Sequence, residues 1–563
     1  MRFVPCFLLV LSSVFAQQEY PKDYFRQPLD ITMELSGNFG ELRSNHFHAG
    51  FDFRTQQKEG LNVYAAADGY ISRIKISSYG YGKAIYITHP NGFTTLYGHL
   101  RSGAGKVEAY IKAQQYKDQA FEIEVLPAPN ELPITKGEVI AYSGNTGGSQ
   151  GPHLHFEIRD SATEKAINPI FFGFAAKLPD TKRPVISDLV VYPLDDDAVV
   201  NKSSVPIVVN LTPQGNGQYS SEKIFAKSKI GFGINTYDSN NNSSNRNGVY
   251  GVKSFLNGKP IFGYEFDTFA FDESRYINAL LDYSRFRQIG QRVQKLFMKQ
   301  KFPLSIIDTD SNNGIINVQP NTTGVYRVEV TDYHGNLSTI SVNIEHSPEA
   351  PLVPVEKRLT PFFLEAAKDH NYEKDNISVF FPAGTFYEDF YLDFDVRANS
   401  LYLNNKNIPV HSNFTVSIKD TLTSDADRKK TFIALVDGKK LTYNSTFLKD
   451  GYFTAKLKAL GKISLAKDDT APVISMAKSI TGKWITNQRT LDVYIKDDLS
   501  GIREYNGWLN GKWILFEYDY KARKLTHVFA DNIVLEGRNE LKVTVSDNAG
   551  NSAIFETHFF RSQ

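Results

Sequence analysis

Short segments in which apolar and polar residues alternate, separated by turn residues, recur along the chain and constrain its fold more than any other feature. A period of two residues is the pattern of a half-buried β-strand, whereas a helix repeats every 3.6 residues. Helical spacing is limited to short stretches, in residues 102–135 and near residues 277–299. The sequence therefore predicts a mainly β protein.

One predicted strand, residues 150–157, carries two histidines separated by a single residue. In a strand, His153 and His155 share one face, while Leu154 and Phe156 point to the core on the other. Imidazole is a common metal ligand and the usual general base near neutral pH. A histidine pair on a surface strand is also an ordinary structural feature, so residues elsewhere in the chain must decide between the two interpretations.

Upstream, His48 and Asp52 supply an imidazole and a carboxylate four residues apart. In a straight strand they would be about 13 Å apart, at roughly 3.3 Å per residue. Both can reach one metal ion only if the chain bends, and Gly50 between them permits a bend. One histidine, one aspartate and one member of the later pair would give three protein ligands. Three ligands with a fourth position open to water are typical of catalytic zinc.

Half of the twelve histidines lie within residues 46–155, at positions 46, 48, 89, 99, 153 and 155. This concentration favours a metal site over scattered local hydrogen bonding. His46, beside His48, is expected to have a structural role near the site rather than to bind the metal.

The pair Asn91-Gly92 predicts a two-residue turn that closes a hairpin over residues 83–99. In this register the numbers of paired residues sum to 183. His89 then lies on one face of the hairpin, and His99 lies on the opposite face with Tyr97. The prediction leaves His89 outside the site and makes His99 available to it.

A chain of 563 residues is too long for one core. Three sequence patterns, at residues 183–187, 256–267 and 330–336, return in the same order at 471–475, 509–519 and 545–551. This order indicates a duplication, and the alternating pattern of each copy predicts an immunoglobulin-like β-sandwich. The predicted parts are a signal peptide (1–16), a first domain that carries the histidine cluster (17–180), a first β-sandwich (181–350), a β-rich module (351–467) and a second β-sandwich (468–563).

The signal peptide is predicted from Arg2, an apolar run over residues 3–10, and Ala16 before Gln17. No stretch has the roughly twenty apolar residues that a membrane helix needs. Cys6 is the only cysteine, so the exported chain has no disulfide, which favours a bacterial envelope. We expect an exported protein in the periplasm or on the surface of a Gram-negative cell.

Without Arg2 the chain has 62 basic and 62 acidic residues, so its charge favours neither nucleic acid nor an anionic membrane.

Three motifs resemble those of the lysostaphin-type zinc endopeptidases, which cut peptidoglycan cross-bridges. They are His48-Ala49-Gly50-Phe51-Asp52, Tyr97-Gly98-His99-Leu100, and residues 144–157, which end in His153-Leu154-His155-Phe156-Glu157. The resemblance implies an antiparallel β-sheet groove with Zn²⁺ on its floor. By the same resemblance the metal ligands are His48, Asp52 and His155, His153 is the general base, and His99 stabilises the transition state. The implied substrate is the peptide part of peptidoglycan, with the bond between D-alanine and a diamino acid favoured.

Other features extend or compete with this interpretation. The insertion at residues 102–135 is expected to wall one end of the groove and to narrow substrate choice. Residues 381–389 resemble the start of a ZU5-type β-domain, from which no function follows. One alternative is a non-catalytic scaffold that activates another wall hydrolase, although such relatives usually lack metal ligands. Another is an adhesin, and an envelope protein could bind the β-sandwiches in either case.

Overall fold

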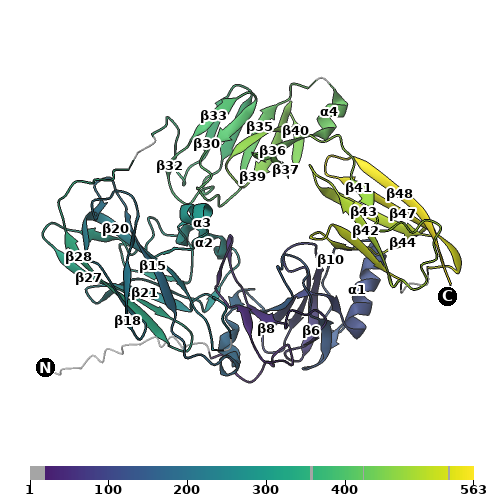
Figure 1. Ribbon diagram of the computed structural model, residues 1–563, viewed down its shortest axis with the longest axis horizontal. Helices are drawn as coiled ribbons and strands as arrows, with labels where there is room; N and C mark the ends of the chain where they lie inside the picture. The colour runs from purple at the N-terminus through teal and green to yellow at the C-terminus, as the bar shows by residue number, and fades with distance from the viewer. Residues whose placement is uncertain (1–18, 242, 356–358, 423, 530–532, 563) are drawn as a thin grey trace, which may run out of the picture.

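The computed structural model describes residues 19–241, 243–355, 359–422, 424–529 and 533–562. The predicted signal peptide, with Cys6, lies outside these residues. The prediction of a mainly β protein is confirmed, and Figure 1 shows four β-rich parts arranged in a ring. We call residues 19–180, 181–350, 359–467 and 468–562 the first, second, third and fourth parts. Within the described ranges, no helix is both long enough and apolar enough to cross a membrane.

The first part is built on a ten-stranded, antiparallel sheet and a smaller three-stranded sheet. The main path of the large sheet is β1 (Leu35–Gly37), β4 (Phe51–Arg54), β13 (His153–Asp160), β8 (Phe93–Leu100), β7 (Lys83–Thr88), β6 (Gly69–Ile76) and β10 (Ile123–Val125). The small sheet is β5 (Asn62–Tyr64), β12 (Val139–Tyr142) and β9 (Ser102–Gly103). The strand that carries the histidine pair, β13, is therefore central and is flanked by β4 and β8.

Alternation along β13 sorts its side chains as predicted. Leu154 and Phe156 are fully buried in the hydrophobic core, whereas His153 and His155 lie on the opposite face. Burial of an aromatic side chain such as Phe156 contributes roughly 1.5–3 kcal/mol. The core side of the strand thus holds the histidine side in a fixed orientation.

The helical spacing in residues 102–135 forms α1 (Gly105–Asp118), with Val107, Ile111 and Gln115 buried. The helix packs against β9 and β12. The second helical stretch, near residues 277–299, contains two short helices, α2 (Ile277–Leu280) and α3 (Tyr283–Ile289).

The second part is a 13-stranded sheet that shares a continuous hydrophobic core with the first part. Its main path is β17 (Ile207–Val209), β15 (Val185–Pro193), β20 (Ile224–Tyr237), β28 (Leu337–His346), β27 (Thr323–Thr331), β21 (Gly251–Leu256), β22 (Lys259–Glu265) and β25 (Ile307–Thr309). A strand pair joins the two parts, because β14 (Ala166–Ile167) pairs with β23 (Thr268–Phe269). Phe39 also packs against Phe269, with ring centroids 5.0 Å apart. The second part is therefore fixed against the first.

The third and fourth parts each pair two antiparallel sheets over one core. The sheets of the third part are β30 (His370–Lys374), β31 (Ile377–Phe381), β35 (Phe414–Lys419), β39 (Tyr452–Leu457) and β38 (Thr446–Lys449), and β33 (Phe394–Arg397), β34 (Ser400–Leu403), β40 (Lys462–Lys467), β36 (Thr431–Asp437) and β37 (Lys440–Asn444). Those of the fourth part are β41 (Val473–Ser475), β42 (Thr490–Lys496), β46 (Lys524–Val528) and β45 (Glu517–Asp519), and β44 (Lys512–Ile514), β43 (Ile502–Leu509), β47 (Gly537–Asp547) and β48 (Ser552–Arg561).

The internal repeat has a structural counterpart in two matching turns. Asp332 accepts hydrogen bonds from the main chain and the side chain of Asn336, at 2.8 and 2.7 Å. Asp547 accepts the same two bonds from Asn551, both at 2.7 Å. The turns join β27 to β28 and β47 to β48. The two copies therefore share this hairpin, while the immunoglobulin-like topology of both stays a prediction, as do the part boundaries.

Candidate active site

His48 and Asp52 lie on the two sides of a bend between β3 (His46–Phe47) and β4, as the spacing predicted. A Cβ atom on Gly50 would lie 2.2 Å from the carbonyl oxygen of Phe156, so only glycine lets the bend approach β13 this closely. On the other side of β4, Asp52 pairs directly with His155 of β13. The pairing of β4 with β13 thus brings His155 next to Asp52.

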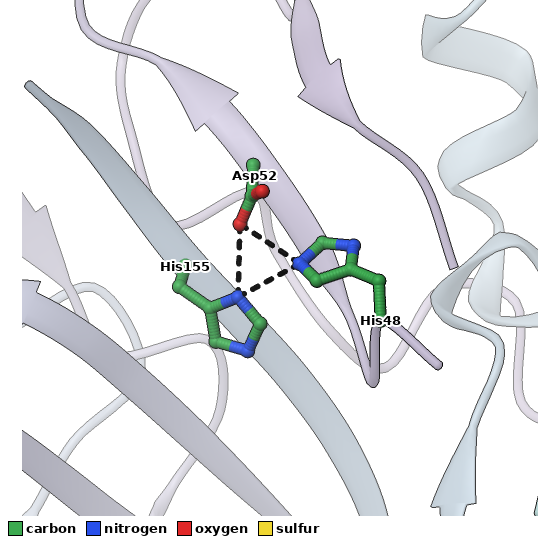
Figure 2. Close-up of side chains that lie close together, drawn as sticks. All are labelled: His48, Asp52 and His155. Atoms are coloured by element: carbon green, nitrogen blue, oxygen red, sulfur yellow. Dashed lines mark hydrogen bonds and ion pairs between the residues drawn. The ribbon is translucent and has the colours of Figure 1, made fainter. Parts of the chain in front are cut away.

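Three atoms of these residues form a nearly equilateral triangle, which Figure 2 shows. Nε2 of His48 lies 2.9 Å from Oδ1 of Asp52 and 3.0 Å from Nδ1 of His155, and Nδ1 of His155 lies 2.9 Å from the same oxygen. All three side chains are buried.

Hydrogen bonds to the far nitrogen of each ring determine where its proton lies. Nδ1 of His48 is 2.7 Å from the carbonyl oxygen of Asn38, which can only accept, so this nitrogen carries hydrogen. Nε2 of His155 is 2.8 Å from the carboxylate of Glu157 and must likewise donate. When both rings are neutral, their lone pairs therefore point at each other and at the Asp52 oxygen. Three converging lone pairs fit a bound cation, and two imidazoles with one carboxylate suit Zn²⁺.

The charges in and around the triangle keep Asp52 and the neighbouring Glu157 ionised. Burial alone would raise the pKa of Asp52, but the three neighbouring histidines hold it well below its usual range. For Glu157, Arg159 and His155 outweigh burial and lower the pKa to about 2. For His155, hydrogen bonds to the two carboxylates outweigh burial and raise the pKa to about 9. Without a metal ion, the triangle therefore attracts a proton.

His153 lies beside the triangle, with Nε2 at 3.4 Å from Oδ1 of Asp52. Its Nδ1 is 2.9 Å from the carbonyl oxygen of Gly151 and 3.1 Å from Oγ of Ser149. Because a carbonyl cannot donate, Nδ1 carries hydrogen, and the lone pair of a neutral ring is then on Nε2.

His99 completes the group, with its ring centroid 4.7 Å from that of His153 and 5.9 Å from that of His155. The pairing of β7 with β8 runs from Ile85↔Tyr97 to Lys83↔Leu100, so β8 contains one extra residue at a β-bulge. Within it His99 has φ of 58°, the left-handed region. The bulge turns His99 out of strict alternation and onto the face that carries His155.

The predicted register of this hairpin is wrong. Paired numbers sum to 182 rather than 183, because Thr88 faces Thr94 and His89 closes a three-residue loop onto Phe93. Proline at position 90 has the fixed φ of a type I turn, and Gly92, at φ 84°, then takes the left-handed position. His89 therefore lies on the same side as Tyr97, and His99 does not, the reverse of the prediction.

The two remaining histidines stand apart from the triangle. His89 is buried and contacts the carbonyl oxygen of Asp68 and Oγ1 of Thr95, both at 2.8 Å, so it takes no part in the site. His46 is exposed, and its Nδ1 lies 3.0 Å from the carbonyl oxygen of Ser44. It lines the groove but does not reach the three converging atoms.

The site opens into a groove of about 1210 Å³. Its walls include the loops at residues 43–47 and 148–152, and four residues of the second part: Phe271, Ser274, Arg275 and Arg292. No residue of the 102–135 insertion lines it, so the expectation that this insertion walls the groove is wrong. Instead, Tyr116 of α1 packs edge-on against Trp513 of the fourth part, with ring centroids 5.4 Å apart.

The sequence predictions missed the polar groups that hold the rings. Glu157 could have been found, because it lies two residues after His155 on the same strand face. Asn38 gave no signal, and Thr146 and Ser149 lie in the third motif but were assigned no role, because all three act through contacts that only the folded chain brings together.

Residues 46–116 and 129–169 match the family described as peptidase family M23, and residues 362–468 match the Zu5-like domain. Among curated relatives, an uncharacterized metalloprotease of Haemophilus influenzae is 31% identical over 172 residues, 30% of each chain. The DD-carboxypeptidase/endopeptidase Mpg of Neisseria meningitidis is 36% identical over 149 residues, 26% of this chain and 28% of the relative. The peptidoglycan DD-endopeptidase ShyA of Vibrio cholerae is 30% identical over 139 residues, 24% of this chain and 26% of the relative.

The chain thus spans less than a third of the length of these relatives. Among solved structures, the catalytic domain of lysostaphin from Staphylococcus simulans is 24% identical, with a TM-score of 0.19, covering 25% of this chain and 91% of that one. The Zu5-like match agrees with the resemblance seen at residues 381–389. Within residues 46–169 the chain is thus similar to peptidase family M23, a family of zinc metallopeptidases.

Proposed function

We propose that the protein is a zinc-dependent endopeptidase that hydrolyses peptide cross-links of bacterial peptidoglycan. The observation that carries this proposal is the convergence of three lone-pair atoms, from His48, Asp52 and His155, beside Nε2 of His153. Two of the relatives named above carry DD-endopeptidase or endopeptidase activity in their names.

In this proposal His48, Asp52 and His155 hold Zn²⁺. When bound, Zn²⁺ lowers the pKa of water towards neutrality and polarises a carbonyl oxygen. Asn38 and Glu157 orient the two ligand rings, because each accepts the hydrogen of the nitrogen that faces away from the metal position.

His153 acts as the general base. Its Nε2 takes a proton from the attacking water as the new carbon–oxygen bond forms. The same nitrogen then gives that proton to the amine that leaves when the carbon–nitrogen bond breaks. Gly151 and Ser149 keep the ring in the tautomer that this transfer needs.

His99 requires a refinement of the role that the family resemblance implies. Its Nδ1 lies 2.8 Å from the carbonyl oxygen of Thr146 and must donate, so Nε2 of the neutral ring is an acceptor. Burial and the neighbouring His153 lower the pKa of His99 to about 3, so the ring is neutral at physiological pH. We therefore assign His99 to accept a hydrogen bond from the attacking water and to orient it. Donation to an oxyanion would require a second ring proton.

The charges of the groove favour an acidic peptide. Arg275 and Arg292 line it from the second part, and no ion pair among the described residues neutralises either guanidinium. Stem peptides of peptidoglycan carry free carboxylates that these groups could bind. We propose the bond between D-alanine and a diamino acid as the one that is cut, in the periplasm or at the surface of a Gram-negative cell. The β-sandwich parts remain available to an envelope protein partner.

A non-catalytic scaffold and an adhesin remain the competing functions. The complete ligand set with a base beside it favours catalysis over both. The test is digestion of purified sacculi by the chain without residues 1–16, with and without a chelator, followed by mass spectrometry of the soluble fragments. We expect chelator-sensitive loss of cross-linked muropeptides, absent with His153→Ala and retained with the control His346→Ala in β28. Intact sacculi in the presence of zinc-loaded protein would reject the enzyme and favour the scaffold.

A further inference from the structure

The duplicated parts each bring three aspartates together at one end of their sheets. Asp180 and Asp468 each lie four residues before the proline of the repeated Pro-Val-Ile-Ser sequence. Asp332 and Asp547 occupy the matching hairpin turns. The third pair follows from strand pairing: Val185 pairs with Tyr237, just before Asp238, and Val473 pairs with Lys496, just before Asp497. The two groups of aspartates therefore occupy equivalent positions.

In the first copy, the aspartates lie around a cavity of about 70 Å³ at the joint between the first and second parts. Carboxylate oxygens of Asp180 and Asp332 lie within 4.8 Å of each other and of a ring nitrogen of His334. Asp238, Asn240 and Asn247 line the same cavity. This volume has room for an ion and several water molecules.

Three buried oxygens of this cavity lack a hydrogen-bond partner among the described residues: Oδ1 of Asp238, Oδ1 of Asn240 and Oδ1 of Asn247. Their residues are only 8%, 9% and 5% exposed. An unsatisfied buried polar group destabilises the folded chain, and here all three are acceptors. A single missing donor could be a chance defect, but three acceptors in one cavity call for a shared positive partner.

The positive side chains nearby do not supply it. Among the described residues, no lysine or arginine forms an ion pair with Asp180, Asp238 or Asp332. The ammonium of Lys182 instead donates to the main-chain oxygen of Asn240, at 2.8 Å. Burial, together with the charges of Asp180 and Asp332, raises the pKa of Asp238 to about 7. The carboxylates therefore repel one another unless a cation joins them.

We propose that this cavity binds Ca²⁺, with the carboxylates of Asp180, Asp238 and Asp332 and the amide oxygens of Asn240 and Asn247 as ligands. Five oxygen ligands, completed by water, match the six to eight that Ca²⁺ takes. His334 is exposed, and imidazole is a poor ligand for this ion, so it is not needed as a ligand.

This cation holds the joint that positions a residue of the zinc site. Gly248, next to Asn247, exchanges two hydrogen bonds with the side chain of Asn38, at 2.7 and 3.0 Å. The carbonyl oxygen of Asn38 in turn accepts from Nδ1 of His48. Ca²⁺ that fixes Asn247 therefore fixes the segment that orients His48, which makes the five ligands positioning residues rather than catalytic ones.

The second copy provides the internal comparison. Asn240 follows Asp238 by two residues, and the residue at the same offset from Asp497 is Leu499. Carboxylate oxygens of Asp468, Asp497 and Asp547 also lie within 4.8 Å of one another. In the part of the chain that the structure describes, however, none of these three aspartates has a buried oxygen without a hydrogen-bond partner, whereas the first copy has three such acceptors. The second copy thus lacks the unsatisfied buried acceptors on which the assignment of the first copy rests, and we assign no ion there.

The test uses Tb³⁺, which replaces Ca²⁺ and emits when excited through nearby tyrosines; Tyr250 and Tyr333 line the cavity. The zinc-loaded full chain is titrated with Tb³⁺, and the bound ion is then displaced with Ca²⁺. We expect sensitised emission that Ca²⁺ removes, with affinity about tenfold weaker or more in Asp238→Asn, because ligand charge tunes Ca²⁺ affinity. Ca²⁺ should also raise the Tm of the parent chain but not that of this variant.

Two further variants keep the result unambiguous. Asn240→Leu copies the residue of the second copy and should weaken Tb³⁺ binding even if Asp238→Asn folds poorly. Asp497→Asn removes the equivalent carboxylate from the second copy and should leave binding unchanged. Absence of sensitised emission in the parent chain, or its loss in Asp497→Asn but not in Asp238→Asn, would overturn the assignment.

Discussion

The ammonium of Lys521 lies 3.0 Å from the main-chain oxygen of Ser149, although 372 residues separate them in the sequence. The same ammonium donates to the main-chain oxygen of Asn145 at 2.6 Å. Oγ of Ser149 is in turn 3.1 Å from Nδ1 of His153. The fourth part thus holds the loop that positions the proposed general base.

Replacement of Lys521 should therefore slow the reaction without removing the metal. In Lys521→Met the loop loses a charge-assisted donor worth roughly 1.5–3 kcal/mol. If about half of that energy orients His153, kcat falls by about tenfold, since 1.36 kcal/mol corresponds to a factor of ten. Muropeptide turnover and bound zinc would be measured together, with Lys512→Met, an exposed lysine of the same part, as the control. Unchanged kcat would show that the contact is structural only.

The three proposed ligands should each be required for zinc. After dialysis, the parent chain is expected to retain about one zinc ion, and His48→Ala, Asp52→Ala and His155→Ala should retain almost none, because three protein ligands are the minimum for a catalytic site. His46→Ala should keep its zinc, because this ring contacts Ser44 rather than the triangle. Mass spectrometry measures the metal content of each variant. If His46→Ala lost zinc as completely as His48→Ala, His46 would have to be counted among the ligands.

Glu157 should tune the affinity for zinc without binding the ion. Its carboxylate accepts from Nε2 of His155 at 2.8 Å and from Nε of Arg159 at 2.7 Å. Loss of such a partner typically weakens metal binding by about 10–100-fold, and Glu157→Gln is expected to do the same. Competition with a chromogenic zinc chelator gives the affinity. Glu164→Gln, which changes a more exposed partner of Arg159, should bind zinc like the parent.

The residues of this site show what a sequence pattern can and cannot predict. The shared face of His153 and His155 follows from the strand period, and the meeting of His48 with Asp52 follows from the glycine between them. The bulge that turns His99 into the site leaves no local pattern, because it depends on how β7 and β8 pair. His99 therefore lies in the predicted site, but on the hairpin face opposite to the one that the predicted register gave it.

Long-range contacts were equally out of reach. The two ends of the Lys521–Ser149 contact lie in turns whose local sequences say nothing about each other. The same holds for the groove residues Arg275 and Arg292, which reach the site through the packing of the second part against the first. Alternation predicted which faces are buried, but the packing of one part against another is decided by the whole folded chain.

His89 should make the first part sensitive to mild acid. Burial lowers its pKa from 6.5 to about 4, against the hydrogen bond to the carbonyl oxygen of Asp68. The unfolded chain therefore binds a proton below pH 6.5 that the folded chain does not bind until about pH 4, so stability falls as the pH decreases through this window. The loss reaches roughly 3 kcal/mol, at 1.36 kcal/mol per pKa unit. Urea unfolding at pH 7 and pH 4.5 should show a smaller loss for His89→Gln than for the parent, whereas the control His346→Gln should lose as much as the parent. Equal losses in all three proteins would mean that His89 does not govern the acid response.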